Sequence, residues 1–195
     1  HERLVGSEMC IRDRSRHALQ SLEIDAVTQI RVTNDYATNF QYQGQQWRLG
    51  VSSIFAAALG LTPFKDVFWT TPEQPGNPYG PKAIDKLVRL NAVISTLTGG
   101  PVGPGDRIDL MNKDLIMRSC NSDGLLLKPS RAATSTDEQI YAKAFGNNKY
   151  GVEGEVWTTY SRIDEYTFGI IFATSMNGLI QMLSLIHISE PTRRS

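Results

Sequence analysis

Strand-like and helix-like segments alternate through the first half of the chain. Residues 24–32 are β-branched or apolar with few polar interruptions, which predicts a parallel strand covered on both faces, and residues 64–71 predict a second strand. Residues 47–61 and 82–97 instead place their apolar side chains at helical spacing. This strand, helix, strand, helix order predicts parallel βα units rather than an antiparallel meander, so we expect an α/β fold.

Turn-forming residues mark the ends of these segments. A polar loop, residues 37–46, separates the first strand from the next helix. A run rich in proline and glycine, residues 72–78, ends the second strand, and Gly99 with Gly100 ends the second helix. Before the first strand, residues 16–23 carry apolar side chains at helical spacing and predict the end of a short helix.

The pattern changes after Asp123. From there on the chain offers short strand candidates separated by glycine, asparagine and aspartate turns, which is typical of an antiparallel all-β domain. We therefore place a domain boundary near Asp123. The strand candidates are residues 125–127, 140–145, 156–160 and 166–174.

Composition excludes several classes of partner. With 20 basic and 20 acidic side chains, the chain has no net charge with which to recruit nucleic acid or an acidic membrane surface. A hydrophobic fraction of 41% and an aromatic fraction of 9% are typical of a globular protein. Two cysteines are too few for a disulfide scaffold or a zinc ribbon. We expect no nucleic-acid or membrane partner.

Both predicted strands end in side chains that could contribute to a site. In βα units the working side chains lie at the carboxyl ends of the strands. Arg31, Asn34 and Asp35 lie at the end of the first strand, and Trp69 at the end of the second offers an indole face on which a sugar ring can pack. Structural alternatives stay open, because an aspartate after a strand is more often a turn residue and a tryptophan there is often packed.

Several motifs occur in the same order as in one family of enzymes. Residues 26–36 resemble the strand that carries Arg-x-Ser-Asp-Asp-aromatic in raffinose synthases and Ser-Asp-x-Thr-Asp in α-galactosidases. Residues 99–106 are similar to the Gly-Gly-x-x-x-x-x-Asp segment of these enzymes, and residues 114–118 to their Asp-x-x-Leu-x-Arg helix. Residues 123–129 resemble the entry into their C-terminal β-domain. The chain thus resembles the α-galactosidase and raffinose-synthase group of glycoside hydrolases.

The resemblance implies a fold and a division of the chain. Residues 15–123 would form the last βα units of a (β/α)8 TIM barrel, and residues 124–182 the start of an antiparallel β-sandwich. Residues 1–14 and 183–195 resemble translated sequencing-adapter sequence, so we expect them to be foreign. The apolar run 168–188 approaches the length of a membrane span only because it includes part of the second foreign segment.

The resemblance also implies a retaining mechanism with two carboxyl groups, one the nucleophile and one the acid/base. The family's acid/base position is occupied here by Asn34, and an amide cannot exchange the required proton. Asp35 has therefore taken the role, or the register is shifted by one, or the protein is not a hydrolase. The nucleophile belongs to an earlier strand that this chain lacks, so we expect the chain alone to be inactive.

The expected substrate is an oligosaccharide or glycoside with an α-galactosyl-type linkage. Asp35 is the candidate catalytic residue, and the candidate substrate-binding residues are Arg31, Asn34, Asp66, Trp69, Glu73 and Gln74. No cofactor is implied, because glycosyl transfer through carboxylates needs neither metal nor nucleotide. A non-catalytic sugar-binding homologue, favoured by Asn34, and a transglycosylase are the alternatives.

Other features carry no competing chemistry. The glycine-rich segment 99–105 is not a phosphate loop, because no Gly-Lys-Ser/Thr follows it and its prolines remove amide donors. His17 is the only histidine in residues 15–182, so this stretch predicts no metal cluster and no Ser–His pair. Cys120 is interpreted as a buried thiol rather than a reactive one.

Overall fold

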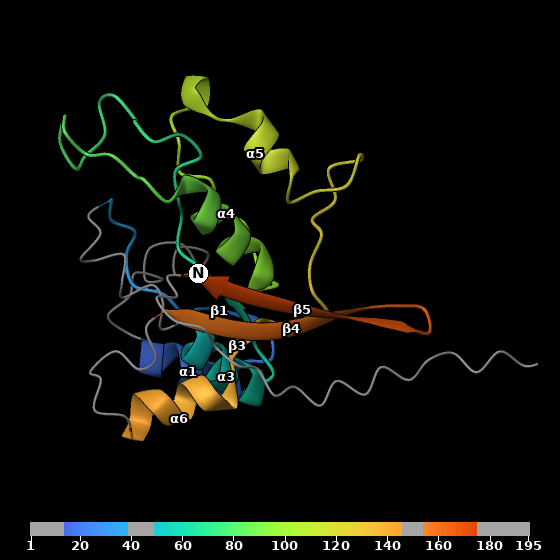
Figure 1. Ribbon diagram of the computed structural model, residues 1–195. Helices are drawn as coiled ribbons and strands as arrows, with labels where there is room; N and C mark the ends of the chain where they lie inside the picture. The colour runs from blue at the N-terminus through green and yellow to red at the C-terminus, as the bar shows by residue number, and fades with distance from the viewer. Residues whose placement is uncertain (1–13, 39–48, 146–153, 175–195) are drawn as a thin grey trace, which may run out of the picture.

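The computed structural model describes residues 14–38, 49–145 and 154–174 (Figure 1). Most of both adapter-like ends and most of the polar loop 37–46 lie outside these residues. The helices and strands are α1 (Arg14–Glu23), β1 (Gln29–Arg31), α3 (Leu49–Ala58), β2 (Thr62–Phe64), α4 (Val88–Leu97), the 3-10 turn η2 (Ile108–Leu110), α5 (Lys113–Met117), β3 (Thr134–Ser135), α6 (Asp137–Phe145), β4 (Glu155–Ile163) and β5 (Tyr166–Thr174).

The first sheet is one parallel βαβ unit. β1 pairs with β2 in parallel, with Gln29 opposite Thr62 and Arg31 opposite Phe64, and α3 connects them. The predicted parallel pairing is thus confirmed for these two strands. A barrel needs eight such strands, so the (β/α)8 barrel stays a prediction.

The second strand was predicted too far along the chain. Residues 64–71 were expected to form it, but the paired residues are Thr62–Phe64. Beyond Phe64 the N–H of Asp66 donates to the side-chain oxygen of Thr33 at 2.8 Å, so a side chain replaces the next rung of the ladder. Further along the same segment, one isolated parallel bridge forms, between Phe68 and Pro104.

Helix α4 begins later than its apolar pattern predicted. Residues 82–87 were expected to be helical, but the helix starts at Val88. The reason is a pairing with the preceding loop: Glu73 and Ile84 form an antiparallel bridge, and the N–H of Asp85 donates to the carbonyl of Pro72 at 2.9 Å. The helix ends where expected, since Gly99 follows it with a positive φ of 77°.

The second sheet is antiparallel, as the change of pattern predicted. Its order is β3-β4-β5, and β4 and β5 form a hairpin in which Glu155 lies opposite Thr174 and Ile163 opposite Tyr166. Asp164 occupies the left-handed region at the hairpin turn, with a φ of 52°. The strands predicted at residues 156–160 and 166–174 are confirmed.

Two of the short strand candidates are not strands. Residues 140–145 belong to helix α6. Thr136 begins that helix, because its side-chain oxygen accepts the N–H of Gln139 at 3.3 Å, and the acidic Asp137 and Glu138 occupy the first turn. Residues 125–127 contribute one antiparallel bridge, Cys120 to Leu126, after a turn that the Asn121 side chain closes.

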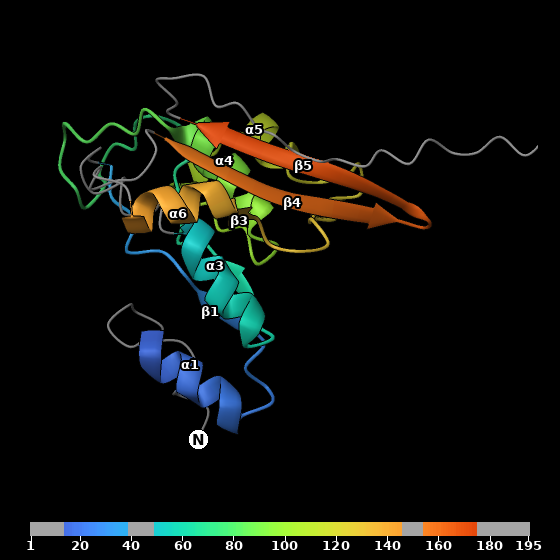
Figure 2. The same ribbon diagram turned by 60° about the horizontal axis from the view of Figure 1, so that its bottom comes forward.

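The main core lies between the two sheets and the helices. Figure 2 shows α3 lying against the antiparallel sheet, while Figure 1 shows α4 and α5 on the opposite side of the strands from α3 and α6. We call the main apolar cluster the Trp157 core. It consists of Ile30, Val32, Leu49, Ala56, Leu61, Ile94, Leu97, Ala133 and Trp157.

Residues from both sides of position 123 meet in the Trp157 core. Trp157 is fully buried against α3, where any side chain at Gly50 would collide with its indole ring. Ala133 is also fully buried there. A second, smaller cluster lies toward the ends of the parallel strands and contains Tyr36, Phe68, Trp69, Ala92 and Leu115. Among the described residues, no helix is both long and apolar enough to cross a membrane.

Candidate functional site

The ends of β1 and β2 bring three of the predicted site residues together. Arg31 donates from Nη2 to Asp35 Oδ1 at 2.7 Å and from Nη1 to Asp66 Oδ1 at 2.8 Å. The side chains of Arg31 and Asp66 are 13% and 14% exposed, whereas that of Asp35 is 71% exposed. One guanidinium therefore holds a sheltered carboxylate and a solvent-facing carboxylate.

Asp66 also fastens the loop that follows β1. Its second oxygen, Oδ2, accepts the N–H of Tyr36 at 2.6 Å. Together with the bond from the Asp66 N–H to Thr33, this contact closes a reciprocal link between the two strand ends. Asn34 lies in the same loop and is half-buried. The loop that carries the candidate acid/base is thus fastened to the residues that follow β2 as well as to Arg31 of its own strand.

Three aromatic rings pack beside these carboxylates. The ring centroids of Tyr36 and Trp69 are 5.8 Å apart, and Tyr79 lies 6.1 Å from Tyr36 and 5.8 Å from Trp69. Trp69, the predicted sugar platform, is only 4% exposed, whereas Tyr79 is 48% exposed. The ring that faces solvent in this cluster is therefore Tyr79.

Two hydrogen bonds hold Tyr79 over the strand ends, one to the loop after β1 and one within its own loop. Its hydroxyl donates to the carbonyl of Tyr36 at 3.0 Å, and its N–H donates to Asn77 Oδ1 at 2.8 Å. Partial burial, with the charges of Asp66 and Asp35, raises the pKa of its phenol. Both carboxylates are thus near enough to influence the phenol. Sequence reasoning missed Tyr79, although an aromatic residue in a proline- and glycine-rich loop after a parallel strand was the available signal.

We use the name strand-end cluster for Arg31, Asp35, Asp66, Tyr36 and Tyr79. Its fixed charges are one guanidinium and two carboxylates, so it presents an excess of hydrogen-bond acceptors around one strong donor group. A neutral ligand with several hydroxyl groups matches such a surface better than an anion does.

A buried polar layer lies beneath the strand-end cluster. Lys65 is 2% exposed, and its Nζ donates to the carbonyls of Asp66 and Val67, each at 3.2 Å. Its Nζ also lies 5.5 Å from the centroid of the Tyr36 ring and 5.6 Å from that of Phe68. Burial lowers the pKa of Lys65 from its ordinary value of 10.5 to about 8, against the opposing effect of Asp66 and Asp85.

Asp85 completes this layer from the loop before α4. It is fully buried and accepts hydrogen bonds from the Tyr36 hydroxyl at 2.5 Å, from Asn91 Nδ2 at 3.0 Å and from the Leu87 N–H at 2.7 Å. Burial, and then the bond to Asp85, raises the pKa of Tyr36. Sequence reasoning missed both Lys65 and Asp85. A lysine within the predicted strand, between Phe64 and Asp66, was the one local signal.

The remaining predicted site residues lie on a separate network. Asp106 Oδ1 accepts hydrogen bonds from the N–H groups of Thr70 and Thr71 and from Gln74 Nε2, the last at 2.7 Å. Gln74 is 4% exposed, and its Oε1 accepts the N–H of Arg107 at 2.9 Å. Both ends of the Gln74 amide are thus engaged in joining two loops. Glu73 is exposed on the same loop.

The described residues contain no group of three or more histidine, cysteine, aspartate or glutamate side chains placed to hold a metal ion. The chemistry that the strand-end cluster can perform is hydrogen bonding to hydroxyl groups, packing of a ring face on Tyr79, and proton exchange at the exposed carboxyl of Asp35. No family model matches the sequence, and no curated protein or solved structure matches it either.

Proposed function

We propose that this chain is part of a carbohydrate-active (β/α)8 enzyme that hydrolyses or transfers α-galactosyl-type glycosides by a retaining mechanism with two carboxylates. The observation that carries the proposal is the position of Arg31 between Asp35 and Asp66, at the ends of two neighbouring parallel strands and beside the exposed ring of Tyr79. Active sites of parallel βα folds form at this end of their strands.

The chemistry of the cluster suits a sugar. The hydroxyl groups of a pyranose donate to carboxylates and accept from a guanidinium, and the carbon face of the ring packs on an aromatic side chain. Asp66 and Arg31 supply the first kind of contact and Tyr79 the second. We therefore assign the stacking role to Tyr79 in place of Trp69.

Asp35 is the candidate acid/base, because its side chain is the exposed carboxylate of the cluster. The nucleophile of the mechanism would come from an earlier strand that this chain does not contain. One observation favours the second candidate, a non-catalytic sugar-binding homologue. Asn34 occupies the position of the family's acid, and an amide cannot exchange the required proton, while the Asp35 carboxylate that would replace it is held by Arg31.

Sugar binding by this chain tests the proposal without requiring catalysis. Methyl α-galactoside would be titrated against the protein, with binding followed by saturation-transfer NMR. We expect saturable binding that Tyr79→Ala weakens about tenfold and Tyr79→Phe preserves, because the ring face supplies the contact. Arg107→Gln, on a surface loop, is the matched control and leaves binding unchanged. Absence of saturable binding, or equal binding by Tyr79→Ala, would contradict the site.

Hydrolysis separates the two candidates. We expect this chain to release no chromophore from an aryl α-galactoside, and release that Asp35→Ala abolishes would show that the chain holds a complete site. In a longer protein that includes the upstream strands, the enzyme predicts turnover that Asp35→Asn lowers by at least about a hundredfold. Sugar binding with no turnover in that longer protein would establish the binding homologue.

A further inference from the structure

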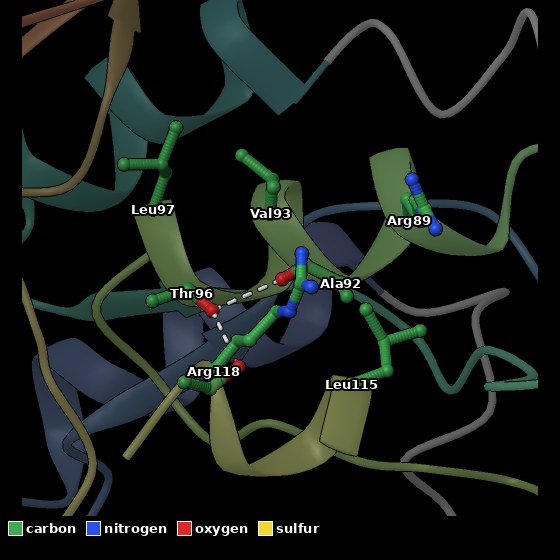
Figure 3. Close-up of a pocket in the computed structure, with 8 residues that line it drawn as sticks. Arg89, Ala92, Val93, Thr96, Leu97, Leu115 and Arg118 are labelled. Carbon is green, nitrogen blue, oxygen red and sulfur yellow. Dashed lines mark hydrogen bonds between the residues drawn. The ribbon is translucent and has the colours of Figure 1, made fainter. Parts of the chain in front are cut away.

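A separate cavity lies between helices α4 and α5, on the side of α4 that faces α5 (Figure 3). Its volume is about 190 Å³. The α4 residues that line it recur at helical spacing, so one stripe of the helix forms one wall, and the end of α5 forms the other. The lining residues are Arg89, Ala92, Val93, Thr96, Leu97, Leu115, Arg118 and Ser119.

The walls of this cavity are mainly apolar. Ala92, Leu97 and Leu115 are buried, while Val93 is 46% exposed and lies at the open side. An engineered apolar cavity of about 150 Å³ is large enough to hold benzene. The space between α4 and α5 therefore accommodates a single aromatic ring or a short alkyl chain.

Two arginine side chains flank the cavity. Within the described part of the chain, neither Arg89 nor Arg118 forms a salt bridge, whereas Arg31 is bound to two carboxylates. A guanidinium is protonated at every accessible pH and offers five N–H donors in a planar fork that matches a carboxylate. In Figure 3 the Arg118 side chain extends over the cavity toward α4, and Arg89 stands at the other end of the same helix face.

A pair of hydroxyl groups lines the same cavity. Thr96 Oγ1 lies 3.0 Å from Ser119 Oγ and 3.0 Å from the carbonyl of Ala92. Ser119 is 4% exposed, so its hydroxyl is sheltered from bulk water. Because a hydroxyl rotates to suit its neighbours, this pair can direct a proton toward a ligand oxygen.

We propose that the cavity between α4 and α5 binds a small organic monoanion with an apolar body, an arylalkanoate or a short-chain alkyl carboxylate. The apolar walls take the ring or chain, and the two arginines take the carboxylate. Unpaired cations beside an apolar cavity favour an anion over a neutral molecule of the same shape. The site shares no residue with the strand-end cluster and does not depend on the proposed function.

The test compares an acid with its neutral counterpart of the same shape. The probe is 3-phenylpropionate, the matched ligand is 3-phenylpropanamide, and affinity is measured by ligand-observed NMR titration of the full chain. We expect the acid to bind at least about tenfold more tightly than the amide, and this preference to shrink as salt is added. Equal affinity for acid and amide, or no saturable binding of the acid, would overturn the proposal.

Variants locate the binding. Arg118→Gln is expected to weaken 3-phenylpropionate binding about tenfold, since it removes the charge while keeping a polar side chain of similar length. Ser119→Ala is expected to weaken binding by a smaller factor. Arg107→Gln, the matched arginine away from the cavity, leaves affinity unchanged. If Arg107→Gln lowers affinity as much as Arg118→Gln does, binding reflects general surface charge and the assigned site is wrong.

Discussion

Two buried regions adjoin the parallel strands, an apolar core that includes Ile30 of β1 and a polar layer beyond the strand ends, and they are held together by different forces. The Trp157 core consists of apolar side chains, whose burial is favourable in any arrangement that fills the space. The layer of Tyr36, Lys65 and Asp85 is polar, and each group in it depends on particular partners. The core therefore contributes most of the stability of the fold, whereas the polar layer fixes the position of the strand-end cluster.

Trp157→Ala gives the largest expected loss. The indole is fully buried and packs against Phe172 with ring centroids 5.1 Å apart, so its removal leaves a large cavity. We expect the free energy of unfolding to fall by about 3–5 kcal/mol, measured by urea denaturation. Trp157→Phe keeps a ring in the space and costs less. A loss below about 1 kcal/mol for Trp157→Ala would show that the core is not centred on this residue.

Asp85→Ala tests the polar layer by the same measurement, the free energy of unfolding. It would leave the Tyr36 hydroxyl, Asn91 Nδ2 and the Leu87 N–H without their acceptor in a dry environment. We expect a loss of about 3 kcal/mol in urea denaturation. Tyr36→Phe removes a single donor and serves as the control, with an expected loss of about 1 kcal/mol. If the two variants lose equal stability, Asp85 does not organise the layer.

The buried charge of Lys65 makes stability depend on pH. Its pKa is about 8 in the fold and 10.5 in an exposed lysine, so the unfolded chain binds more protons between these values. The free energy of unfolding should therefore rise from pH 8 toward pH 10, by up to about 3 kcal/mol for the full shift. Above pH 10 the raised pKa of Tyr36 opposes this gain, because the unfolded tyrosine ionises first.

Lys65→Met is the control for that pH dependence. The variant removes the titrating group while keeping a long side chain, so the rise between pH 8 and pH 10 should disappear from its denaturation curves. The same rise in Lys65→Met would assign the effect to another group.

The smallest effect is expected outside both regions. Arg107 pairs with Asp109 through bonds of 2.6 and 2.7 Å, but both side chains are more than half exposed. Solvent screens such a pair, so Arg107→Gln should not change the denaturation midpoint measurably. A clear loss would mean that surface charge contributes to this fold as much as the buried layer does.

Local sequence patterns predicted the type of an element where the spacing of its apolar and turn residues reflects the face that the element buries. The alternation of strand and helix patterns predicted the parallel pairing of β1 with β2, and turn residues predicted the β4–β5 hairpin. The pattern failed at α6, where Ile140 and Tyr141 suggested a strand but the Thr136 cap and the acidic first turn favour a helix. It also failed at residues 82–87, because their pairing with Pro72 and Glu73 is not encoded locally.

By itself, the sequence determined that Arg31 and Asp35 stand at the end of a parallel strand, where working side chains of βα units lie. The early end of β2 at Phe64, which places Asp66 beside them, was decided by the tertiary structure. Only the tertiary structure decided which aromatic ring faces solvent, that Lys65 and Asp85 are buried beneath the site, and that the arginines beside the α4–α5 cavity form no salt bridge with any described residue. Exposure and pairing depend on residues distant in the chain, whereas a strand or helix pattern depends on neighbours a few positions away.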